Sequence, residues 1–308
     1  MTQTQYFKNL TPPEGAIDVV LDTDAYNEID DQFAISYMLG HPEKLQIKGI
    51  CAAPFHNENS TGPEDGMEKS YKEILKLLEL AGHSKLESSV YKGSPCYLPD
   101  EQTAVSSEAA DFMANLANQY TPEKPLYIVA IGAITNVASA ILQNPAMKEN
   151  CVLVWLGGHA LHWPDRGASE FNMRQDIAGA RIVFGCGIPL VQLPCVGVVS
   201  AFATGEPELA HWLKGKNALC DYLYQHTVEA AETYAAGKPW TRTIWDVTAV
   251  AWLLNEGNRF MSDQLIPSPI PQYDFQYACP AQRHWIQYVY HINRDALMED
   301  LFNTLGGF

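Results

Sequence analysis

The sequence predicts an α/β fold, with a doubly wound, mostly parallel β-sheet and a helical C-terminal portion. Apolar, strand-like segments alternate with amphipathic, helix-like segments through the first two thirds of the 308 residues. The strand-like segments are continuously apolar, which is typical of parallel strands that helices cover on both faces. No internal repeat, low-complexity tract or Gly/Ser linker divides the chain. We therefore expect a single domain over residues 1–308.

The predicted elements follow from hydrophobic periodicity. The expected strands of the first two thirds are 17–22, 45–51, 126–131, 151–156 and 188–193. The expected helices between them are 31–39, 66–81, 107–119, 135–143 and 176–184. The last third is mainly helical, at 207–214, 217–236, 244–255 and 294–305, with a late strand near 285–290. Open parallel sheets bind ligands beyond the carboxyl ends of their strands, so functional residues are expected there.

Charge and composition narrow the possible partners. A formal net charge of −16 argues against nucleic acid or an anionic membrane surface, because both attract basic patches. The charge is compatible with a cation site and a neutral small-molecule substrate. Seven cysteines without a C-x-x-C pair favour buried free thiols in a reducing compartment. The N-terminal residues lack a secretory pattern and no apolar run reaches a membrane span, so we expect a cytoplasmic protein.

The stretch DTDAYNEIDD, residues 22–31, gathers four aspartates and a glutamate directly after the first predicted strand. Desolvated carboxylates of like charge are costly unless a cation or hydrogen-bond donors compensate. One interpretation is helix capping, and we expect Asp30 or Asp31 to cap the helix that follows. Capping does not account for Asp22 and Asp24, and hard cations such as Ca²⁺ or Mg²⁺ prefer carboxylate and carbonyl oxygens. Both interpretations stay open at this point.

Two later segments carry further candidates. Glu170 and Asn172 lie in a long polar loop after a strand, and an acceptor carboxylate beside an amide suits vicinal sugar hydroxyls. An ordinary loop is the competing interpretation. Thr243 and Asp246 have the spacing of a capping box at the start of the helix expected over 244–255. Trp245, between them, could simply belong to the core.

Together these segments resemble the calcium-dependent nucleoside hydrolases, of the inosine-uridine preferring and purine-specific types. The family's motifs occur in order from about residue 17 to 305: Asp22-Thr23-Asp24…Asp30-Asp31, Gly132-Ala133-Ile134-Thr135-Asn136, Gly157-Gly158, Glu170-Phe171-Asn172…Asp176, and Asp246. Each motif is weak alone, but five in register are specific. The resemblance implies hydrolysis of the N-glycosidic bond of ribonucleosides, with Ca²⁺ as cofactor. We also expect a homo-oligomer, either a dimer or a tetramer.

The resemblance also implies roles for the residues that match. Asp24 would be a calcium ligand and the base that activates water. Asp31 would be the main, bidentate ligand, the backbone carbonyl of Thr135 another, and Asp246 the last carboxylate. Asp22 would orient its neighbours, and it is the next candidate for the base. The hydroxyls of the ribose would be held by Asp30, Glu170 and Asn172.

Several positions depart from the family pattern. The loop between Asp24 and Asp31 is two residues longer than usual. A histidine often precedes the last aspartate and protonates the leaving base; here the residue is Trp245, as in purine-specific members, where stacking raises the basicity of a purine. The asparagine expected after the second strand has no clean counterpart, and His56 or Asn57 is the candidate. The metal and ribose ends of the site thus match better than the leaving-group and 5′-hydroxyl ends.

Three functions remain open on the sequence alone. The leading hypothesis is a hydrolase of ribonucleosides that prefers purines. The first alternative is a related calcium-dependent hydrolase of another pentofuranoside or glycosyl compound. The second is a catalytically silent protein that binds a sugar or nucleoside, which Asp24 argues against, because binding alone needs no general base.

Overall fold

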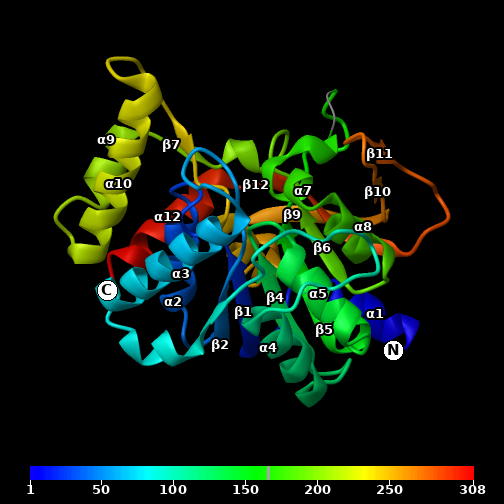
Figure 1. The fold of residues 1–308 in the computed structure, drawn as a ribbon. Coiled ribbons are helices and arrows are strands. Elements are labelled where there is room, and N and C mark those ends of the chain that lie inside the picture. The colour runs from blue at the N-terminus through cyan, green and yellow to red at the C-terminus, as the bar shows by residue number, and fades with distance from the viewer. Residues whose placement is uncertain (165–166) are drawn as a thin grey trace.

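A mixed eight-stranded sheet forms the centre of the computed structural model, which describes residues 1–164 and 167–308 (Figure 1). The strands, in spatial order, are β3 (Val90–Lys92), β2 (Leu45–Ala52), β1 (Ile17–Thr23), β4 (Leu126–Ala130), β5 (Cys151–Leu156), β6 (Leu190–Leu193), β12 (Trp285–Ile292) and β9 (Met261–Pro267). Neighbouring strands are parallel except β9, which pairs antiparallel with β12. The predicted α/β class with a mostly parallel sheet is confirmed.

Helices cover both faces of this sheet. Side chains of successive strand residues point to opposite faces, so one strand contributes to the core on each side. In β1, Val19 and Leu21 belong to one core cluster and Val20 to the other. The first cluster includes residues of α2 (Asp31–Leu39), α3 (Pro63–Leu80), α11 (Val247–Trp252) and α12 (Arg294–Leu305). The second includes residues of α4 (Glu108–Leu116), α5 (Thr135–Gln143) and α8 (Ile177–Gly185).

The remaining elements surround this centre. They are the helices α1 (Gln3–Asn9), α6 (Met147–Asn150), α7 (Phe171–Gln175), α9 (Glu206–Trp212) and α10 (Ala218–Ala235), and the antiparallel pairs β7 (Ala203–Thr204) with β8 (Arg242–Thr243) and β10 (Ile270–Pro271) with β11 (Tyr277–Ala278). Short 3₁₀ helices lie at 84–89, 117–119, 167–169, 199–201 and 256–258. Helices α9 and α10 project from one side of the molecule (Figure 1).

Some predicted boundaries are wrong for identifiable reasons. The helix expected over 244–255 is only Val247–Trp252, because residues 244–246 form the turn between β8 and the helix and residues 253–254 form another turn. The edge strand β9 escaped prediction because MSDQLIP is polar and half-exposed. All seven cysteines are free, as expected, although Cys96 and Cys279 are exposed rather than buried. None of the described helices is both long and apolar enough to cross a membrane.

Candidate active site

Five buried aspartates meet at the carboxyl end of β1. Asp22 and Asp24 lie at and just beyond the end of this strand, and Asp30 and Asp31 begin α2. Asp246 precedes α11, which packs against α2, so the amino ends of the two helices come together. None of the five aspartates forms an ion pair with any residue that the structure describes.

Helix capping does not explain these carboxylates. Asp30 occupies the N-cap position of α2 and Asp31 lies in its first turn, so the expected positions are confirmed, but the N-cap side chain makes no capping hydrogen bond. The predicted capping box of Thr243 and Asp246 is wrong. Thr243 lies in β8, and the Asp246 side chain makes no capping hydrogen bond to α11. The side chains of Asp30 and Asp246 are therefore free for another task.

The carboxylates repel one another in the absence of a cation. Asp30, Asp31 and Asp246 each offer an oxygen within 4.8 Å of the other two. Burial raises the pKa of Asp31 to about 7 and the pKa of Asp30 and Asp246 well above the usual range, with neighbouring carboxylates adding to the effect. Such a cluster of hard oxygen donors fits a divalent cation such as Ca²⁺ or Mg²⁺.

Asp24 stands beside this cluster with both carboxylate oxygens buried and without a hydrogen-bond partner among the described residues. Burial, followed by the charges of Asp31 and Asp30, raises the pKa of Asp24 well above its ordinary value. Gly132 lies against the carboxylate: a Cβ atom there would come within 2.9 Å of Oδ1. An orphaned buried carboxylate is costly unless a ligand completes its environment.

Asp22 and Thr135 take part in neighbouring hydrogen bonds. Asp22 Oδ1 accepts from Nδ2 of Asn136 at 2.8 Å, its other oxygen is unpaired, and burial raises the pKa of Asp22 to about 7. Thr135 is the first residue of α5, and its hydroxyl donates to Asp176 at 2.6 Å. Thr135 is buried near the carboxyl end of the sheet.

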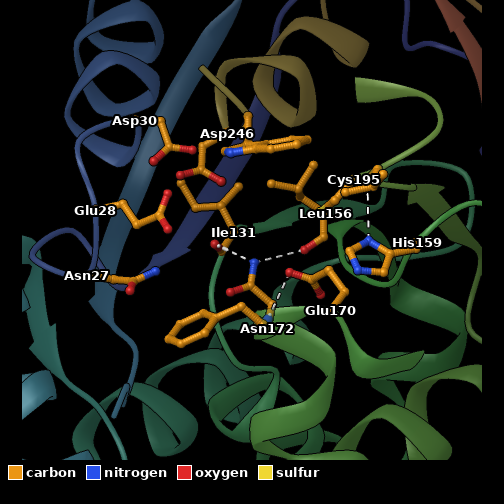
Figure 2. A pocket seen from close by; sticks show the side chains of 13 residues that line it. Asn27, Glu28, Asp30, Ile131, Leu156, His159, Glu170, Asn172, Cys195 and Asp246 are labelled. Carbon is orange, nitrogen blue, oxygen red and sulfur yellow. Dashed lines mark hydrogen bonds between the residues drawn. The ribbon is translucent and has the colours of Figure 1, made fainter. Parts of the chain in front are cut away.

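A cavity of about 160 Å³ opens beside the carboxylates (Figure 2). Its walls include five of the predicted site residues: Asp30, Glu170, Asn172, Trp245 and Asp246. The other residues that line it are Asn27, Glu28, Ile131, Leu156, His159, Phe171, Cys195 and Val196. Asp24, Asp31, Thr135, His56 and Asn57 were also predicted and do not line it.

Backbone contacts fix the orientation of Glu170 and Asn172. Glu170 caps α7: its Oε1 accepts from the Asn172 amide and its Oε2 from the amides of Gly158 and Met173, at 2.9 to 3.0 Å. Nδ2 of Asn172 donates to the carbonyls of Ile131 and Leu156, at 3.0 and 3.1 Å. Both amide protons are thereby used, so Asn172 offers its Oδ1 to the cavity as an acceptor (Figure 2).

Trp245 is half-buried. Its ring packs against the first core cluster and also lines the cavity. It is thus not a fully buried core residue, and it is placed where an aromatic face could meet a ligand.

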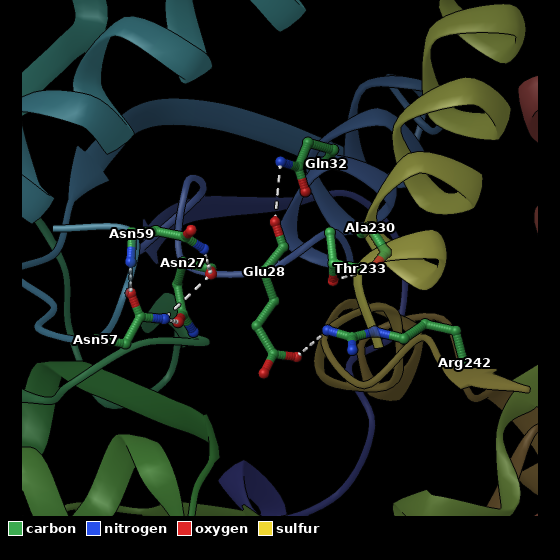
Figure 3. A network of polar contacts seen from close by, with 8 residues as sticks. All are labelled: Asn27, Glu28, Gln32, Asn57, Asn59, Ala230, Thr233 and Arg242. Atoms are coloured by element: carbon green, nitrogen blue, oxygen red, sulfur yellow. Dashed lines mark hydrogen bonds and ion pairs between the residues drawn. The ribbon is translucent and has the colours of Figure 1, made fainter. Parts of the chain in front are cut away.

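His56 and Asn57 do not reach this cavity. His56 is exposed, and its backbone amide donates to Gln175. Asn57 instead holds Asn27: its Nδ2 lies 2.6 Å from Oδ1 and 3.2 Å from the carbonyl oxygen of Asn27 (Figure 3). Because Oδ1 of Asn27 faces Asn57, its Nδ2 points into the cavity, as Figure 2 also shows.

Asn27 and Glu28 also line a second, larger cavity of about 470 Å³. This cavity lies between the 26–29 and 57–59 segments and helix α10. Glu28 is paired with Arg242 at 2.5 Å across its wall (Figure 3). The two cavities thus meet at Asn27 and Glu28, which belong to the lengthened loop between Asp24 and Asp31.

Sequence reasoning missed Asn27, Glu28, His159 and Cys195 as cavity residues. For Asn27 and Glu28 a signal existed, since both stand inside the acidic stretch in the loop that is longer than the family pattern. His159 follows the Gly157-Gly158 turn, but a loop histidine is usually solvated and nothing in the sequence distinguishes this one. Cys195 resembles any other buried thiol.

Comparison with known families identifies one that covers most of the chain. A sequence model described as "Inosine-uridine preferring nucleoside hydrolase" matches residues 19–286. The pyrimidine-specific ribonucleoside hydrolase RihA of Escherichia coli O127:H6 is 27% identical over 205 residues, which cover 57% of this chain and 59% of RihA. RihA of Citrobacter koseri is 28% identical over 204 residues, with the same coverage. The chain thus spans less than two thirds of the length of these curated relatives.

Solved structures with the same fold cover nearly the whole chain. A plant nucleoside hydrolase, the PpNRh1 enzyme, superimposes with a TM-score of 0.73 over 95% of this chain and 99% of its own, at 18% identity. A purine-preferring ribonucleoside hydrolase from Gardnerella vaginalis gives a TM-score of 0.72 over 94% and 98%, at 20% identity. At these identities the likeness establishes the fold.

Proposed function

The chain belongs to the inosine-uridine preferring nucleoside hydrolase family, and we propose that it hydrolyses the N-glycosidic bond of ribonucleosides to free base and ribose. The observation that carries this proposal is the group of buried aspartates without ion-pair partners beside a cavity walled by Glu170 and Asn172. A cation and a polyhydroxylated ligand together would satisfy these groups. The eight-stranded sheet draws strands from both ends of the chain, which supports a single domain over residues 1–308.

We propose Ca²⁺ as the ion. Asp24, Asp31, Asp246 and the backbone carbonyl of Thr135 would hold it, with Asp30 close by. Support comes from the carboxylates of Asp30, Asp31 and Asp246, which converge within 4.8 Å, and from the unpaired oxygens of Asp24 beside them. When bound, the ion would offset the mutual repulsion of the carboxylates and make a nearby water molecule more acidic.

Asp24 is our candidate for the general base. Water attacks C1′ of the ribose, and Asp24 takes the proton that the water releases. The C1′–N bond breaks, and its electron pair leaves with the base, which gains a proton. The carboxylates around the ring would stabilise the positive charge that develops on the sugar. Asp22 would not touch the substrate, because it lies within β1, accepts a hydrogen bond from Asn136 and does not line the cavity.

The cavity offers complementary groups for the ribose hydroxyls. Asn172 and Glu170 present acceptors, and Asn27 presents a donor through Nδ2. Asp30 approaches from the carboxylate cluster. A volume of about 160 Å³ is well below the range of about 300–1,000 Å³ that is usual for drug-sized ligands, so it would enclose the sugar but not a whole purine nucleoside.

The base would extend past Asn27 and Glu28 toward the second cavity. The segment that carries Arg242 and Trp245 borders both cavities, since Arg242 lines the second and Trp245 the first. We propose that Trp245 stacks on a purine and so favours its departure. The name of RihA specifies pyrimidines and that of the Gardnerella enzyme purines, so this preference rests on Trp245.

A substrate screen tests the proposal. Purine and pyrimidine ribonucleosides and other pentofuranosides are incubated with the protein, in Ca²⁺ and in chelator, and released reducing sugar is measured. Calcium-dependent release from ribonucleosides is expected. Release only from non-nucleoside furanosides would support the first alternative. Binding without any release would support a silent binding protein.

A further inference from the structure

Gln175, the last residue of α7, joins three segments of the chain beside the candidate site. Its Oε1 accepts from the backbone amide of His56 at 2.7 Å and from the hydroxyl of Tyr97 at 2.5 Å. His56 follows β2 and Tyr97 follows β3, whereas α7 is the helix that Glu170 caps. One amide oxygen therefore holds the segments after two neighbouring strands against α7.

The hydrogen bonds determine which way this amide points. A backbone N–H can only donate, so the atom of Gln175 that faces the amide of His56 must be the oxygen. Nε2 of Gln175 is buried and has no hydrogen-bond partner among the described residues. The two bonds to Oε1 are thus the hydrogen bonds that hold this side chain within the described part of the chain.

The bond to His56 is transmitted to the cavity through the next residue. Asn57 donates its Nδ2 to Oδ1 and to the carbonyl oxygen of Asn27 (Figure 3). Ser60 closes the segment, because its hydroxyl donates to the carbonyl of Phe55 and its amide to the carbonyl of Asn57. The 55–60 segment is therefore bonded to itself, and a contact that fixes His56 also fixes Asn57.

Tyr97 is held on the other side of the same junction. The amide of Leu98 donates to Oδ2 of Asp176 at 3.2 Å, so residues 97 and 98 contact residues 175 and 176 at successive positions. Burial, followed by the charge of Asp24, raises the pKa of Tyr97, which keeps the phenol protonated as a donor to Gln175. Tyr97 thereby secures the side chain that holds the 55–60 segment.

The two amides that point into the first cavity come from opposite sides of this junction (Figure 2). Asn172 lies on α7, where its own bonds to the carbonyls of Ile131 and Leu156 fix it. Asn27 lies in the loop after β1 and is oriented by Asn57. Groups that bind one ligand together must keep their separation to within about 0.5 Å. A contact between α7 and the 55–60 segment sets this separation.

We propose that Gln175 is a positioning residue, which sets the place of Asn27 relative to Asn172 through the 55–60 segment, with Tyr97 securing its side chain. The inference rests on the proposed function for the identity of the ligand, a ribose. The motif Glu170-Phe171-Asn172…Asp176 leaves position 175 open, so the role belongs to a residue that the motif does not specify.

A double-mutant cycle tests whether Gln175 acts through Asn27. Gln175→Met has a similar length and lacks the acceptor. In the wild-type background it should lower kcat/KM for a ribonucleoside, measured in Ca²⁺, about 3- to 10-fold, the size expected for one hydrogen bond. In the Asn27→Ala background the same substitution should lower kcat/KM less than about twofold, because the residue that it positions is gone.

Two tyrosines provide the graded variant and its control. Tyr97→Phe removes one of the two donors to Gln175 and should lower kcat/KM about two- to threefold. Tyr91→Phe is the matched control and should leave it unchanged, because the Tyr91 ring stacks on Phe112 and its hydroxyl has no hydrogen bond to a described residue. An equal loss from Gln175→Met in both backgrounds, or no loss in the wild type, would overturn the inference while the proposed function stands.

Binding provides a readout that does not need turnover. Calorimetry measures the affinity of a cationic pyrrolidine analogue of ribose for the wild type, for Gln175→Met, for Asn27→Ala and for the double variant. A loss of affinity from Gln175→Met that disappears when Asn27 is absent would support the inference even if no nucleoside were hydrolysed. Losses that add in the double variant would overturn the inference alone, whereas no binding by the wild type would overturn it together with the proposed function.

Discussion

Nδ2 of Asn57 donates to Oδ1 of Asn27 at 2.6 Å, so the asparagine predicted to bind substrate instead orients another asparagine that lines the cavity. The bond fixes which end of the Asn27 amide faces the cavity, and it makes Asn27 a donor beside acidic neighbours. Asn27 stands in the lengthened loop between Asp24 and Asp31. We therefore propose that the loop after β1, rather than the segment after β2, supplies the amide that contacts the substrate.

This arrangement predicts a graded loss of activity. Asn27→Ala removes a direct contact and should lower kcat/KM for ribonucleosides about 10- to 100-fold, which corresponds to about 1–3 kcal/mol. Asn57→Ala should lower kcat/KM less, about 3- to 10-fold, because Asn27 stays in place but loses the hydrogen bond that orients its amide. Asn59→Ala is the control, since the Asn59 side chain donates to the backbone carbonyl of Asn27 rather than to its amide group. The bond from the Asn59 backbone amide to Oδ1 of Asn57 remains in this variant. A larger loss in Asn57→Ala than in Asn27→Ala would contradict the assignment.

Calcium should stabilise the folded protein, because Asp24, Asp30, Asp31 and Asp246 repel one another without it. A ligand that binds only the native state adds about 2.7 kcal/mol at a hundredfold excess over Kd. Thermal melts in chelator and in added Ca²⁺ measure the shift, which should be about 4 °C. Asp31→Ala should abolish most of the response. An unchanged melting temperature of the wild-type protein would contradict the proposed calcium site.

The same carboxylates predict an unusual pH dependence for the metal-free protein. Burial raises the pKa of Asp22 and of Asp31 to about 7, so the folded state binds more protons than the unfolded chain between about pH 4 and pH 7. Their contribution to stability is present at low pH and is lost as the pH rises through 7. Ca²⁺ favours the charged carboxylates and should remove this loss. Chemical denaturation at pH 5.5 and 7.5, with chelator and with Ca²⁺, measures how the free energy of unfolding changes with pH in each condition. A pH slope that is the same in both conditions would show that these carboxylates do not bind the ion.

The sheet and the acidic cluster could be predicted because local sequence encodes them. The continuous apolar run of 17–21 marks a strand buried on both faces, and helix 135–143 was predicted with its observed bounds. The acidic stretch pointed to the carboxyl end of β1, where the five aspartates do meet. Alternating strands and helices indicate a parallel sheet, and residues that follow its strands lie at the carboxyl edge of that sheet.

The finer features depend on packing that no local pattern records. The spacing of Thr243 and Asp246 fits a capping box, but pairing with β7 draws residues 242–243 into a strand. Asp30 has the right position for a cap, yet its side chain does not bond the helix. His159 lines the cavity only because the 195–196 segment folds back against its loop. Contacts between segments decide each of these outcomes.

Asp24→Asn tests the proposed base. The amide cannot take a proton from water, so kcat should fall about 100- to 10,000-fold, while KM should change much less. Because both oxygens of Asp24 are buried without partners, removal of the charge should leave the metal-free melting temperature unchanged or raise it. Lost activity in a variant that keeps the rise in melting temperature with Ca²⁺ would therefore implicate proton transfer rather than the metal site. A variant that keeps near-wild-type kcat would shift the role to Asp22.

Trp245→Ala tests the proposed purine preference. If the indole stacks on the leaving base, the variant should lose much more activity on inosine or guanosine than on a nitrophenyl riboside, whose activated leaving group departs without help. Trp245 also packs against the core, so its loss should lower stability. A half-buried ring should cost less than the 3–5 kcal/mol typical of a fully buried aromatic.

The two substrates separate stacking from packing because they share the ribose and the ion but differ in the leaving group. Trp245→Phe keeps an aromatic face and should retain more activity on purines than Trp245→Ala. Pyrimidine ribonucleosides, which offer a smaller surface for stacking, should show an intermediate loss. If instead kcat/KM fell equally on purine nucleosides and the nitrophenyl riboside, and the melting temperature fell with it, Trp245 would act through the core alone. The purine preference would then lose its support, and a pentofuranoside with a different leaving group would become the better candidate substrate.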